Sequence, residues 1–275
     1  MALPLSGEAA VWRGKSKLRE LRGHSSRCVN KIKFNCTGEL IATASNDGTC
    51  RIWQVTTGAM LITEYFGPAV TALVWRDEEG LLAGCSGGTI YLLDVKQNKA
   101  GSTKRRLVFE LGSNPANLAL NLNKSLLASS SNTKVAVWRL DTLSNLNTLT
   151  GHKARVDEVK FSPTLFPLLA TWDQEWQIRL WDALAGTCQK VIQCRQGGMK
   201  THHVENFLSF SPDGQLLACR GEEVSVFRVA TGRLDTVYKV EGKMVCWNSN
   251  SNKLAVVTKD YGEKGEIDKV IIFNT

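Results

Sequence analysis

Short stretches in which apolar and polar residues alternate run along most of this 275-residue chain. The stretches are rich in β-branched and aromatic residues, and clusters of Gly, Asn, Asp and Ser separate them. Alternation with a period of two is typical of β-strands, and the separating residues are typical of turns. The apolar positions follow no helical period of 3.6. The pattern therefore predicts an all-β fold built from many short strands.

The predicted strands recur in a fixed order. Residues 22–55 align with residues 150–183, and in both segments the Gly of a Gly-His pair lies 30 positions before a Trp. Between these landmarks lie an alternating strand ending in Phe, a turn, an apolar strand, a polar turn and a third strand ending in Trp. Weaker copies occupy 69–95, 116–140, 205–232 and 243–275. The chain thus holds about six units of about 43 residues, which is the period of a propeller blade.

These residues resemble the WD-repeat β-propeller family. Residues 151–182 keep its frame from Gly-His to Trp-Asp, and residues 23–54 run from Gly-His to Trp-Gln. The resemblance implies a single propeller of about six four-stranded blades over residues 17–275, preceded by an N-terminal extension over residues 1–16.

In this family a His, a Ser or Thr, an Asp and a Trp form a hydrogen-bonded relay that holds the strands of a blade together. By position, the first unit offers His24, Thr43, Asp47 and Trp53. The fourth unit offers His152, Thr171, Glu175 and Trp181, with Glu where Asp is usual. A Trp side chain can only donate its N–H, so a buried Trp needs an acceptor of this kind. We expect the relay to be structural and not catalytic.

The stretch 17–21, KLREL, has two interpretations. A WD repeat begins with the outermost strand of the preceding blade, so this stretch is predicted to pair with the last strand, at 269–274. The ring would then be closed by the N-terminal and C-terminal strands, and no blade edge would be left open. Leu18 and Leu21 do not alternate perfectly, so a small basic helix is the alternative.

Composition narrows the class of protein. Lys and Arg outnumber Asp and Glu by 34 to 26, and the net charge of +8 permits acidic or nucleic-acid partners without requiring them. The eight cysteines form no Cys-x-x-Cys pair and the four histidines have no complementary spacing, so no metal site or cofactor is expected. No signal peptide and no run of about 18 apolar residues is seen. We expect a protein that is not secreted and spans no membrane, with free buried thiols in a reducing compartment.

Two motifs suggest catalysis, but neither has the context that catalysis needs. GCSGG at 84–88 matches G-x-S-x-G, yet a nucleophile elbow requires a strand-to-helix turn and no helix follows. GGMKT at 197–201 lacks the full phosphate-loop pattern. Since no set of nucleophile, base and orienting residue is visible, the chain is predicted not to be an enzyme and to have no small-molecule substrate.

A propeller most often binds partners on the face whose loops enter the innermost strands. In this chain those loops carry Arg27, Lys153, Arg155, Lys200, His202, His203 and Lys243. The face is therefore predicted to be net positive, although loop Lys and Arg also serve solubility alone. Trp172 and Trp176 flank a hairpin turn where small or polar residues are normal. One or both are candidate exposed anchors for a partner, and packing against a neighbouring blade is the alternative.

A narrower resemblance concerns residues 14–53 and the long charged excursion between the last two strands within 246–273. Both are similar to the WD-repeat subunit of the THO complex, which acts in mRNA packaging and nuclear export. This implies a nuclear scaffold that binds other protein subunits. The alternatives are a generic adaptor of another complex (ribosome-bound, ubiquitin-ligase or ciliary), located in the nucleus or the cytoplasm, and a propeller that binds RNA directly. Strongly salt-dependent affinity for nucleic acid would favour the last.

Overall fold

The computed structural model describes residues 21–25, 28–95, 104–111, 115–194, 208–220, 223–240, 242, 244–262 and 265–275. Every regular element in these residues is a β-strand, and within each sheet successive strands pair antiparallel. The predicted all-β class is therefore confirmed for the described part of the chain. The predicted strand 17–21 lies outside the described residues except for Leu21.

The described strands form six sheets, which we number in chain order. Sheet 1 contains β1 (Val29–Phe34), β2 (Leu40–Ser45), β3 (Thr49–Gln54) and β4 (Met60–Tyr65). Sheet 2 contains β5 (Val70–Trp75), β6 (Gly80–Cys85), β7 (Thr89–Asp94) and β8 (Lys104–Glu110). Sheet 3 contains β9 (Pro115–Leu120), β10 (Leu126–Ser131), β11 (Lys134–Arg139) and β12 (Ser144–Leu149).

The second half of the chain repeats this plan. Sheet 4 contains β13 (Val156–Phe161), β14 (Leu168–Asp173), β15 (Gln177–Asp182) and β16 (Thr187–Gln193). Sheet 5 contains β17 (Leu208–Phe210), β18 (Leu216–Cys219), β19 (Val224–Arg228) and β20 (Leu234–Tyr238). Sheet 6 has three described strands, which are β21 (Met244–Trp247), β22 (Lys253–Gly262) and β23 (Gly265–Asn274).

Tight turns join the strands within a sheet. In the turn between β2 and β3, Gly48 has a φ of 77°, a left-handed conformation that glycine adopts at little cost. A side chain at this position would also meet the carbonyl oxygen of Gly67, which lies 2.6 Å from the place of a Cβ atom. The turn residues that separate the alternating stretches thus set where each strand begins and ends.

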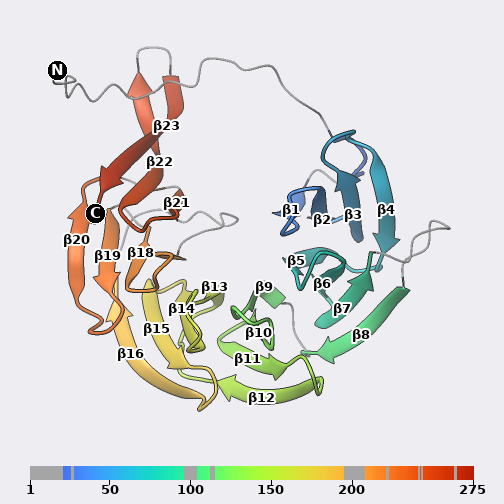
Figure 1. The fold of residues 1–275 in the computed structure, drawn as a ribbon, viewed down its shortest axis with the longest axis horizontal. Coiled ribbons are helices and arrows are strands. Elements are labelled where there is room, and N and C mark those ends of the chain that lie inside the picture. Colours follow the sequence, from blue (N-terminus) through green and yellow to red (C-terminus); the bar gives the residue numbers. More distant parts are fainter. Residues whose placement is uncertain are drawn as a thin grey trace.

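The six sheets are arranged around a common centre in chain order (Figure 1). The first strand of each sheet is the innermost, and β1, β5, β9, β13, β17 and β21 contact one another in that order. Apolar side chains fill the space between each pair of successive sheets, from sheets 1 and 2 to sheets 5 and 6. The core is therefore a series of five apolar layers between six sheets.

Hydrogen bonds between inner strands reinforce these layers. The indole N–H of Trp75 donates to the Lys33 carbonyl oxygen of sheet 1 over 3.0 Å. The indole N–H of Trp247 donates in the same way to the Ser209 carbonyl oxygen of sheet 5, over 2.9 Å. Thr71 Oγ1 donates to the Pro115 carbonyl oxygen of sheet 3 over 2.8 Å. Each of these bonds fixes the position of one sheet relative to the next.

Sheets 1 and 6 are the exception to this packing. Among the described strands, β21 and β1 do not pack against each other as the other neighbouring inner strands do. Figure 1 shows the two sheets at the two ends of an open arc. The predicted closure of the ring through residues 17–21 lies outside the described residues and stays a prediction.

The last hairpin is longer than the others. Strands β22 and β23 pair without interruption from Lys253 opposite Asn274 to Gly262 opposite Gly265. The charged excursion expected between the last two strands is therefore itself a continuation of both strands, and it extends beyond the arc of sheets (Figure 1).

Candidate functional site

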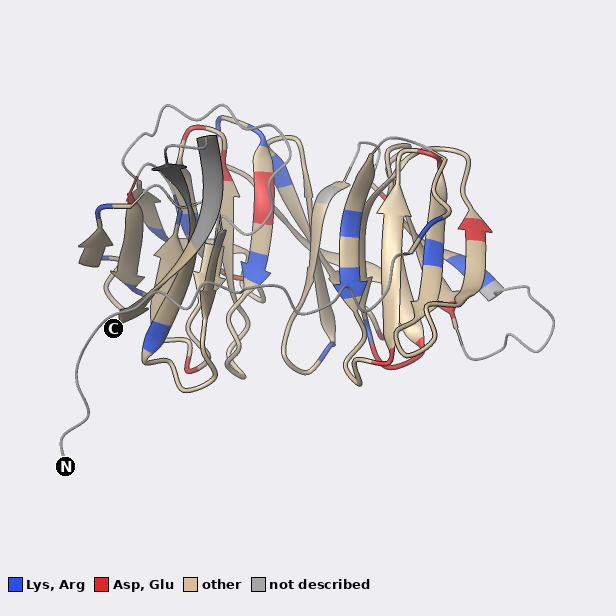
Figure 2. Ribbon diagram, turned by 90° about the horizontal axis from the view of Figure 1, so that it is seen from above, with Lys and Arg blue, Asp and Glu red and all other residues tan. Residues whose placement is uncertain are grey.

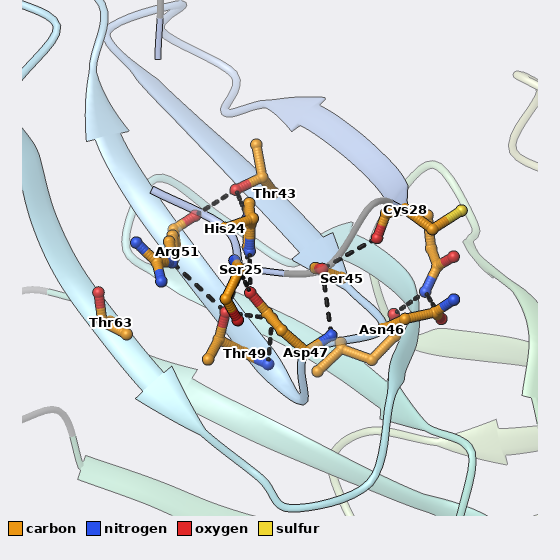
Figure 3. A network of polar contacts seen from close by, with 12 residues as sticks. His24, Ser25, Cys28, Thr43, Ser45, Asn46, Asp47, Thr49, Arg51 and Thr63 are labelled. Atoms are coloured by element: carbon orange, nitrogen blue, oxygen red, sulfur yellow. Dashed lines mark hydrogen bonds and ion pairs between the residues drawn. The ribbon is translucent and has the colours of Figure 1, made fainter. Parts of the chain in front are cut away.

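A connected set of polar side chains lies where the turn between β2 and β3 meets the segment before β1 (Figure 3). His24 Nε2 lies 2.7 Å from Thr43 Oγ1, and His24 Nδ1 lies 3.0 Å from Asp47 Oδ2. The indole N–H of Trp53 donates to Thr43 Oγ1 over 2.9 Å. The four residues proposed for the first relay are thus in direct contact. They link the segment before β1 to β2, β3 and the turn between them.

The directions of these bonds follow from what each group can donate. The Asp47 carboxylate only accepts, so the neutral imidazole of His24 donates from Nδ1 and accepts at Nε2. The Thr43 hydroxyl can then donate to His24 while it accepts from Trp53. Thr49 donates to Asp47 Oδ1 through its hydroxyl (2.6 Å) and its backbone N–H (2.9 Å). Every polar atom along this path has a suitable partner.

These bonds alter the acidity of Asp47. Burial by itself would raise the pKa of this carboxyl group. Hydrogen bonds from the Thr49 hydroxyl, from His24 and from the backbone N–H groups of Thr49 and Ser25 outweigh burial, and they hold the pKa well below its ordinary value. Asp47 therefore stays ionised in the folded protein even in mild acid.

Sheet 4 contains the same arrangement with one difference from the sequence prediction. His152 Nε2 lies 2.6 Å from Thr171 Oγ1, and the Trp181 indole N–H donates to the same oxygen over 2.9 Å. The carboxylate partner of His152 is Asp173, with Oδ2 2.6 Å from Nδ1. The assignment of Glu175 to this relay was wrong, because Glu175 is exposed and contributes its backbone N–H to Asp173 Oδ1.

The geometry of the turns explains why the carboxylate comes from different positions. Asp47 lies within the turn, whereas Asp173 is the last residue of β14. Both bind the backbone N–H of the first residue of the next strand, which is Thr49 in sheet 1 and Gln177 in sheet 4. Two positions two residues apart thus deliver a carboxylate to the same place, beside the His.

A Thr, a His and an Asp in this order have the composition of a nucleophile, a base and an orienting acid. Accessibility argues against that role. Thr171 is fully buried and Thr43 nearly so, and each hydroxyl already accepts a bond from a Trp. A nucleophile needs space beside it for the reacting carbon, and neither hydroxyl has that space. Each relay instead joins the strands of its own sheet.

The loop face beside the fourth relay carries charges of both signs. Lys153 and Arg155 are exposed, as predicted. Arg155 Nε lies 2.6 Å from Asp157 Oδ1, and exposed Glu175 lies in the adjoining turn. Figure 2 shows that positions of both signs are interspersed along the described ribbon. The prediction of a net positive face also concerns loops that lie outside the described residues, and it stays a prediction.

The two candidate anchor residues pack against each other. Trp172 is buried between sheets 4 and 5, and the prediction that it could be exposed was wrong for this residue. Its ring meets that of Trp176 edge to face, with centroids 5.5 Å apart. Trp176 is half-buried and has a φ of 64°, at the turn position that Gly48 occupies in sheet 1. Local packing thus covers the Trp172 side chain almost completely and the Trp176 side chain in part.

The other predicted partner-binding residues lie outside the described residues. They are Arg27, Lys200, His202, His203 and Lys243. Their assignment to a partner face stays a prediction.

Two buried charged side chains were not among the predicted site residues, and the ion pair that one of them, Glu158, forms over 3.2 Å is with Lys160. Glu158 in β13 and Arg220 after β18 are almost fully buried, and Glu158 Oε2 accepts the backbone N–H of Leu208 over 3.0 Å. Burial lowers the pKa of Arg220, and the charge of Glu158 opposes that effect. The signal in the sequence is weak, since Glu158 stands between Val156 and Val159 at a position that the alternation does not mark as special.

The cysteines also differ from expectation. All eight are free, but Cys36, Cys188 and Cys246 are exposed, so the prediction of buried thiols was wrong for these three. Cys194 and Cys219 are buried, with their sulfur atoms 3.2 Å apart. Contact with Cys194, followed by burial, raises the pKa of Cys219 and keeps it protonated.

The described residues contain neither a metal site nor a membrane-spanning helix. No group of three His, Cys, Asp or Glu side chains is placed to hold a metal ion. None of the described elements is a helix with the length and apolar character to cross a membrane.

Comparison with known proteins adds to this picture. Residues 15–54 match the family described as WD domain, G-beta repeat. This match supports the resemblance to the WD40 repeat family. The chain is 28% identical over 244 residues to periodic tryptophan protein 2 of Arabidopsis thaliana, which covers 84% of this chain and 25% of that protein. It is 24% identical over 231 residues to the homolog of Dictyostelium discoideum, which covers 80% of this chain and 24% of that protein.

A shorter match concerns a B-type cell cycle switch protein of Medicago truncatula, 30% identical over 149 residues, with 52% of this chain and 30% of that protein covered. The chain spans about a quarter of the length of the two periodic tryptophan proteins. WD40 repeat proteins are generally non-catalytic scaffolds that bind other proteins. The relatives named here are not THO subunits by name, so the narrower resemblance stays a prediction.

Proposed function

We propose that this WD40 protein is a non-catalytic scaffold that holds other protein subunits in a nuclear RNA–protein assembly. The observation that carries the proposal is the state of the two Thr-His-Asp sets. Both are buried and internally saturated with hydrogen bonds, and both join strands of a sheet. The polar residues that most resemble catalytic groups thus stabilise the sheets. We therefore place the function on the surface of the protein.

The identity of the assembly rests on the sequence. Residues 14–53 and the extended last hairpin support a subunit of the THO type, acting in mRNA packaging and export in the nucleus. The similarity to periodic tryptophan proteins and to a cell cycle switch protein supports the second candidate, an adaptor of another multiprotein complex.

The loop face with Lys153 and Arg155 is the proposed contact for an acidic partner segment. Charges at the rim of an interface mainly change the association rate and its salt dependence. The half-buried Trp176 lies beside them and offers an apolar surface for the same partner. Direct binding of RNA would instead give an affinity that falls steeply with salt.

The test is affinity capture from a nuclear extract, with bound proteins identified by mass spectrometry at low and at moderate salt. The double variant Lys153→Glu, Arg155→Glu is expected to recover several-fold less partner while its melting curve stays unchanged. The matched control is Lys134→Glu, Arg139→Glu, which reverses two exposed charges on sheet 3 and is expected to bind as the wild type does.

The proteins recovered decide between the candidates. Recovery of THO subunits supports the first, and recovery of another complex without them supports the adaptor. Equal capture by both double variants would refute the proposed face. Recovery that disappears after RNase treatment would show that RNA, and not protein, is the bound partner.

A further inference from the structure

A pair of buried thiols spans the apolar layer between the neighbouring sheets 4 and 5 (Figure 1). Cys194 follows β16 of sheet 4, and Cys219 is the last residue of β18 in sheet 5. The two residues are 5% and 1% exposed, and their sulfur atoms lie 3.2 Å apart. Two cysteines that are 25 positions apart in the sequence are thus in contact across two sheets.

The backbone holds each cysteine in place. The N–H of Cys194 donates to the Trp176 carbonyl oxygen over 2.9 Å, which fixes the end of β16. Cys219 pairs with Leu208 on one side and with Ser225 on the other, so it lies inside sheet 5. Bonded sulfur atoms lie about 2.0 Å apart, so a disulfide requires these two to approach by about 1.2 Å. A movement of this size is within the range of side-chain rotation.

The hydrogen bonds of the two thiols orient their sulfur atoms. The Cys194 thiol donates to the Cys219 sulfur, and the Cys219 thiol donates to the Arg220 carbonyl oxygen over 3.5 Å. The proton of Cys219 therefore points away from Cys194, and a lone pair of the Cys219 sulfur faces Cys194. In this arrangement Cys219 can attack a Cys194 sulfur that carries a leaving group.

Sheet 5 lacks a hydrogen bond that joins the strands of sheets 1 and 4. Strand register places Cys219 where those sheets have the Thr of the relay, and it places Phe227 where they have the Trp. A Phe ring has no N–H, so the bond from Trp to Thr cannot form here. The four strands of sheet 5 are also short, with three to five residues each. A covalent link to sheet 4 would strengthen a sheet that this bond does not hold.

We propose that Cys194 and Cys219 are a site of reversible oxidation, at which hydrogen peroxide joins them in a disulfide that locks sheet 5 onto sheet 4. The oxidant has to be small because both thiols are nearly buried. Cys219 is the more buried of the two, and its raised pKa keeps it protonated, so Cys194 reacts first. This site goes beyond the scaffold role proposed above and does not depend on it.

The reaction consists of two displacement steps. The Cys194 sulfur attacks one oxygen of hydrogen peroxide, so that an S–O bond forms, the O–O bond breaks and the leaving hydroxide takes up the thiol proton as water. The Cys219 sulfur then attacks the sulfur of this sulfenic acid, so that the S–S bond forms, the S–O bond breaks and the Cys219 proton leaves with a second water. Two thiols thus lose two hydrogen atoms, and one peroxide is reduced to two waters.

The first test is oxidation of the folded full chain that carries Cys36→Ser, Cys188→Ser and Cys246→Ser. These substitutions remove the exposed thiols, which peroxide would otherwise oxidise as well. Hydrogen peroxide is expected to remove two hydrogen atoms from the intact mass. Peptide mapping without reductant is expected to show the Cys194 peptide joined to the Cys219 peptide, and dithiothreitol is expected to separate them.

Single variants in this background test the order of the steps. In Cys219→Ser the sulfenic acid on Cys194 has no partner, so it is expected to accumulate and to be labelled by dimedone. In Cys194→Ser, Cys219 is expected to stay unlabelled. The matched control is Cys85→Ser, which removes a buried thiol between sheets 1 and 2 at a position where sheets 1 and 3 have Ser. It is expected to form the disulfide as its parent does.

The second test measures the lock itself. The disulfide closes a loop that contains β17, the inner strand of sheet 5, and it is expected to raise the melting temperature by about 5–10 °C. Dithiothreitol is expected to reverse the increase. The same peroxide treatment is expected to give no increase in Cys219→Ser.

Three outcomes would overturn the proposal. A disulfide between another pair, such as Cys50 and Cys85, would show that the contact across sheets 4 and 5 does not direct the reaction. Oxidation to a disulfide in urea, with none in the folded chain, would show that folding does not place the two sulfur atoms for reaction. A disulfide between Cys194 and Cys219 that left the melting temperature unchanged would refute the lock.

Discussion

Sheets 1 and 4 are built on the same repeat, yet they differ in how much of it is buried. Both have a His, a Thr, an Asp and a Trp joined by hydrogen bonds of 2.6–3.0 Å. The His152 and Asp173 side chains are each 1% exposed, whereas those of His24 and Asp47 are 8% and 5% exposed. The inner-strand Phe of sheet 4 is buried and that of sheet 1 is not. The repeat thus determines the strands and the relay, and the neighbouring sheet determines the burial.

The largest expected effect separates the two Phe residues. Phe161→Ala removes a buried ring between sheets 3 and 4 and is expected to reduce the free energy of unfolding by about 3–5 kcal/mol. Phe34→Ala removes an exposed ring and is expected to change it by no more than about 0.5 kcal/mol. Denaturant unfolding of both variants measures the difference. Equal losses would mean that the sheet 1 face is covered in solution by this chain itself.

A smaller difference in stability is expected between variants of the two relays. Asp173→Ala leaves buried His152 without its acceptor and is expected to lower stability by about 3 kcal/mol, whereas Asp47→Ala is expected to cost about 1 kcal/mol because water can reach the site more easily. Glu175→Ala is the control, with an expected change within about 0.5 kcal/mol. If Glu175→Ala cost as much as Asp173→Ala, the assignment of Asp173 to the relay would be wrong.

The smallest effect is a change with pH in the first relay. Folding lowers the pKa of Asp47, so its contribution to stability is complete above its unfolded value of about 3.9 and is lost as the pH falls toward the folded value. The stability difference between wild type and Asp47→Asn is therefore expected to be constant from about pH 7 to pH 5 and to shrink below about pH 4. Unfolding curves across this range measure it. A difference that grew in acid would contradict the stated direction of the shift.

Much of the fold could be predicted from the sequence because it depends on local order. Alternation fixes which residues face the layers, and the constant spacing from Gly-His to Trp fixes the length of each repeat. These signals predicted the strands of sheets 1 and 4, and the family resemblance, carried over by position, named seven of the eight residues that form the two relays. The eighth, Asp173, was missed because counting from the His cannot show that a carboxylate at a strand end and one inside a turn reach the same point.

The error at Trp172 and the mixed charges beside Arg155 have another cause. Trp172 pairs with Glu158 and Ile178 within sheet 4, and its burial comes from sheet 5. Arg155 has its charge balanced by Asp157, two residues away but on the strand that follows. Asp157 is near Arg155 in the sequence but belongs to the strand β13 and not to the loop, whereas the sheet 5 residues that cover Trp172 are far from it in the sequence. For the same reason the exposure of Ile32 and Phe34 could not be predicted, since it depends on which sheet stands next to β1.

Each sheet is formed by a contiguous stretch of chain, and this has a consequence for synthesis. A ribosome adds about 5–20 residues per second, so roughly 2–8 seconds separate the completion of one sheet from that of the next. During each interval the newest sheet exposes an apolar face that only the following sheet will cover. The arc therefore grows from the first sheet to the last, and at each stage its newest sheet has an exposed apolar face. A translational pause soon after sheet 1, 2 or 3 has left the ribosome would prolong the time in which that face is open to chaperones or to unwanted partners.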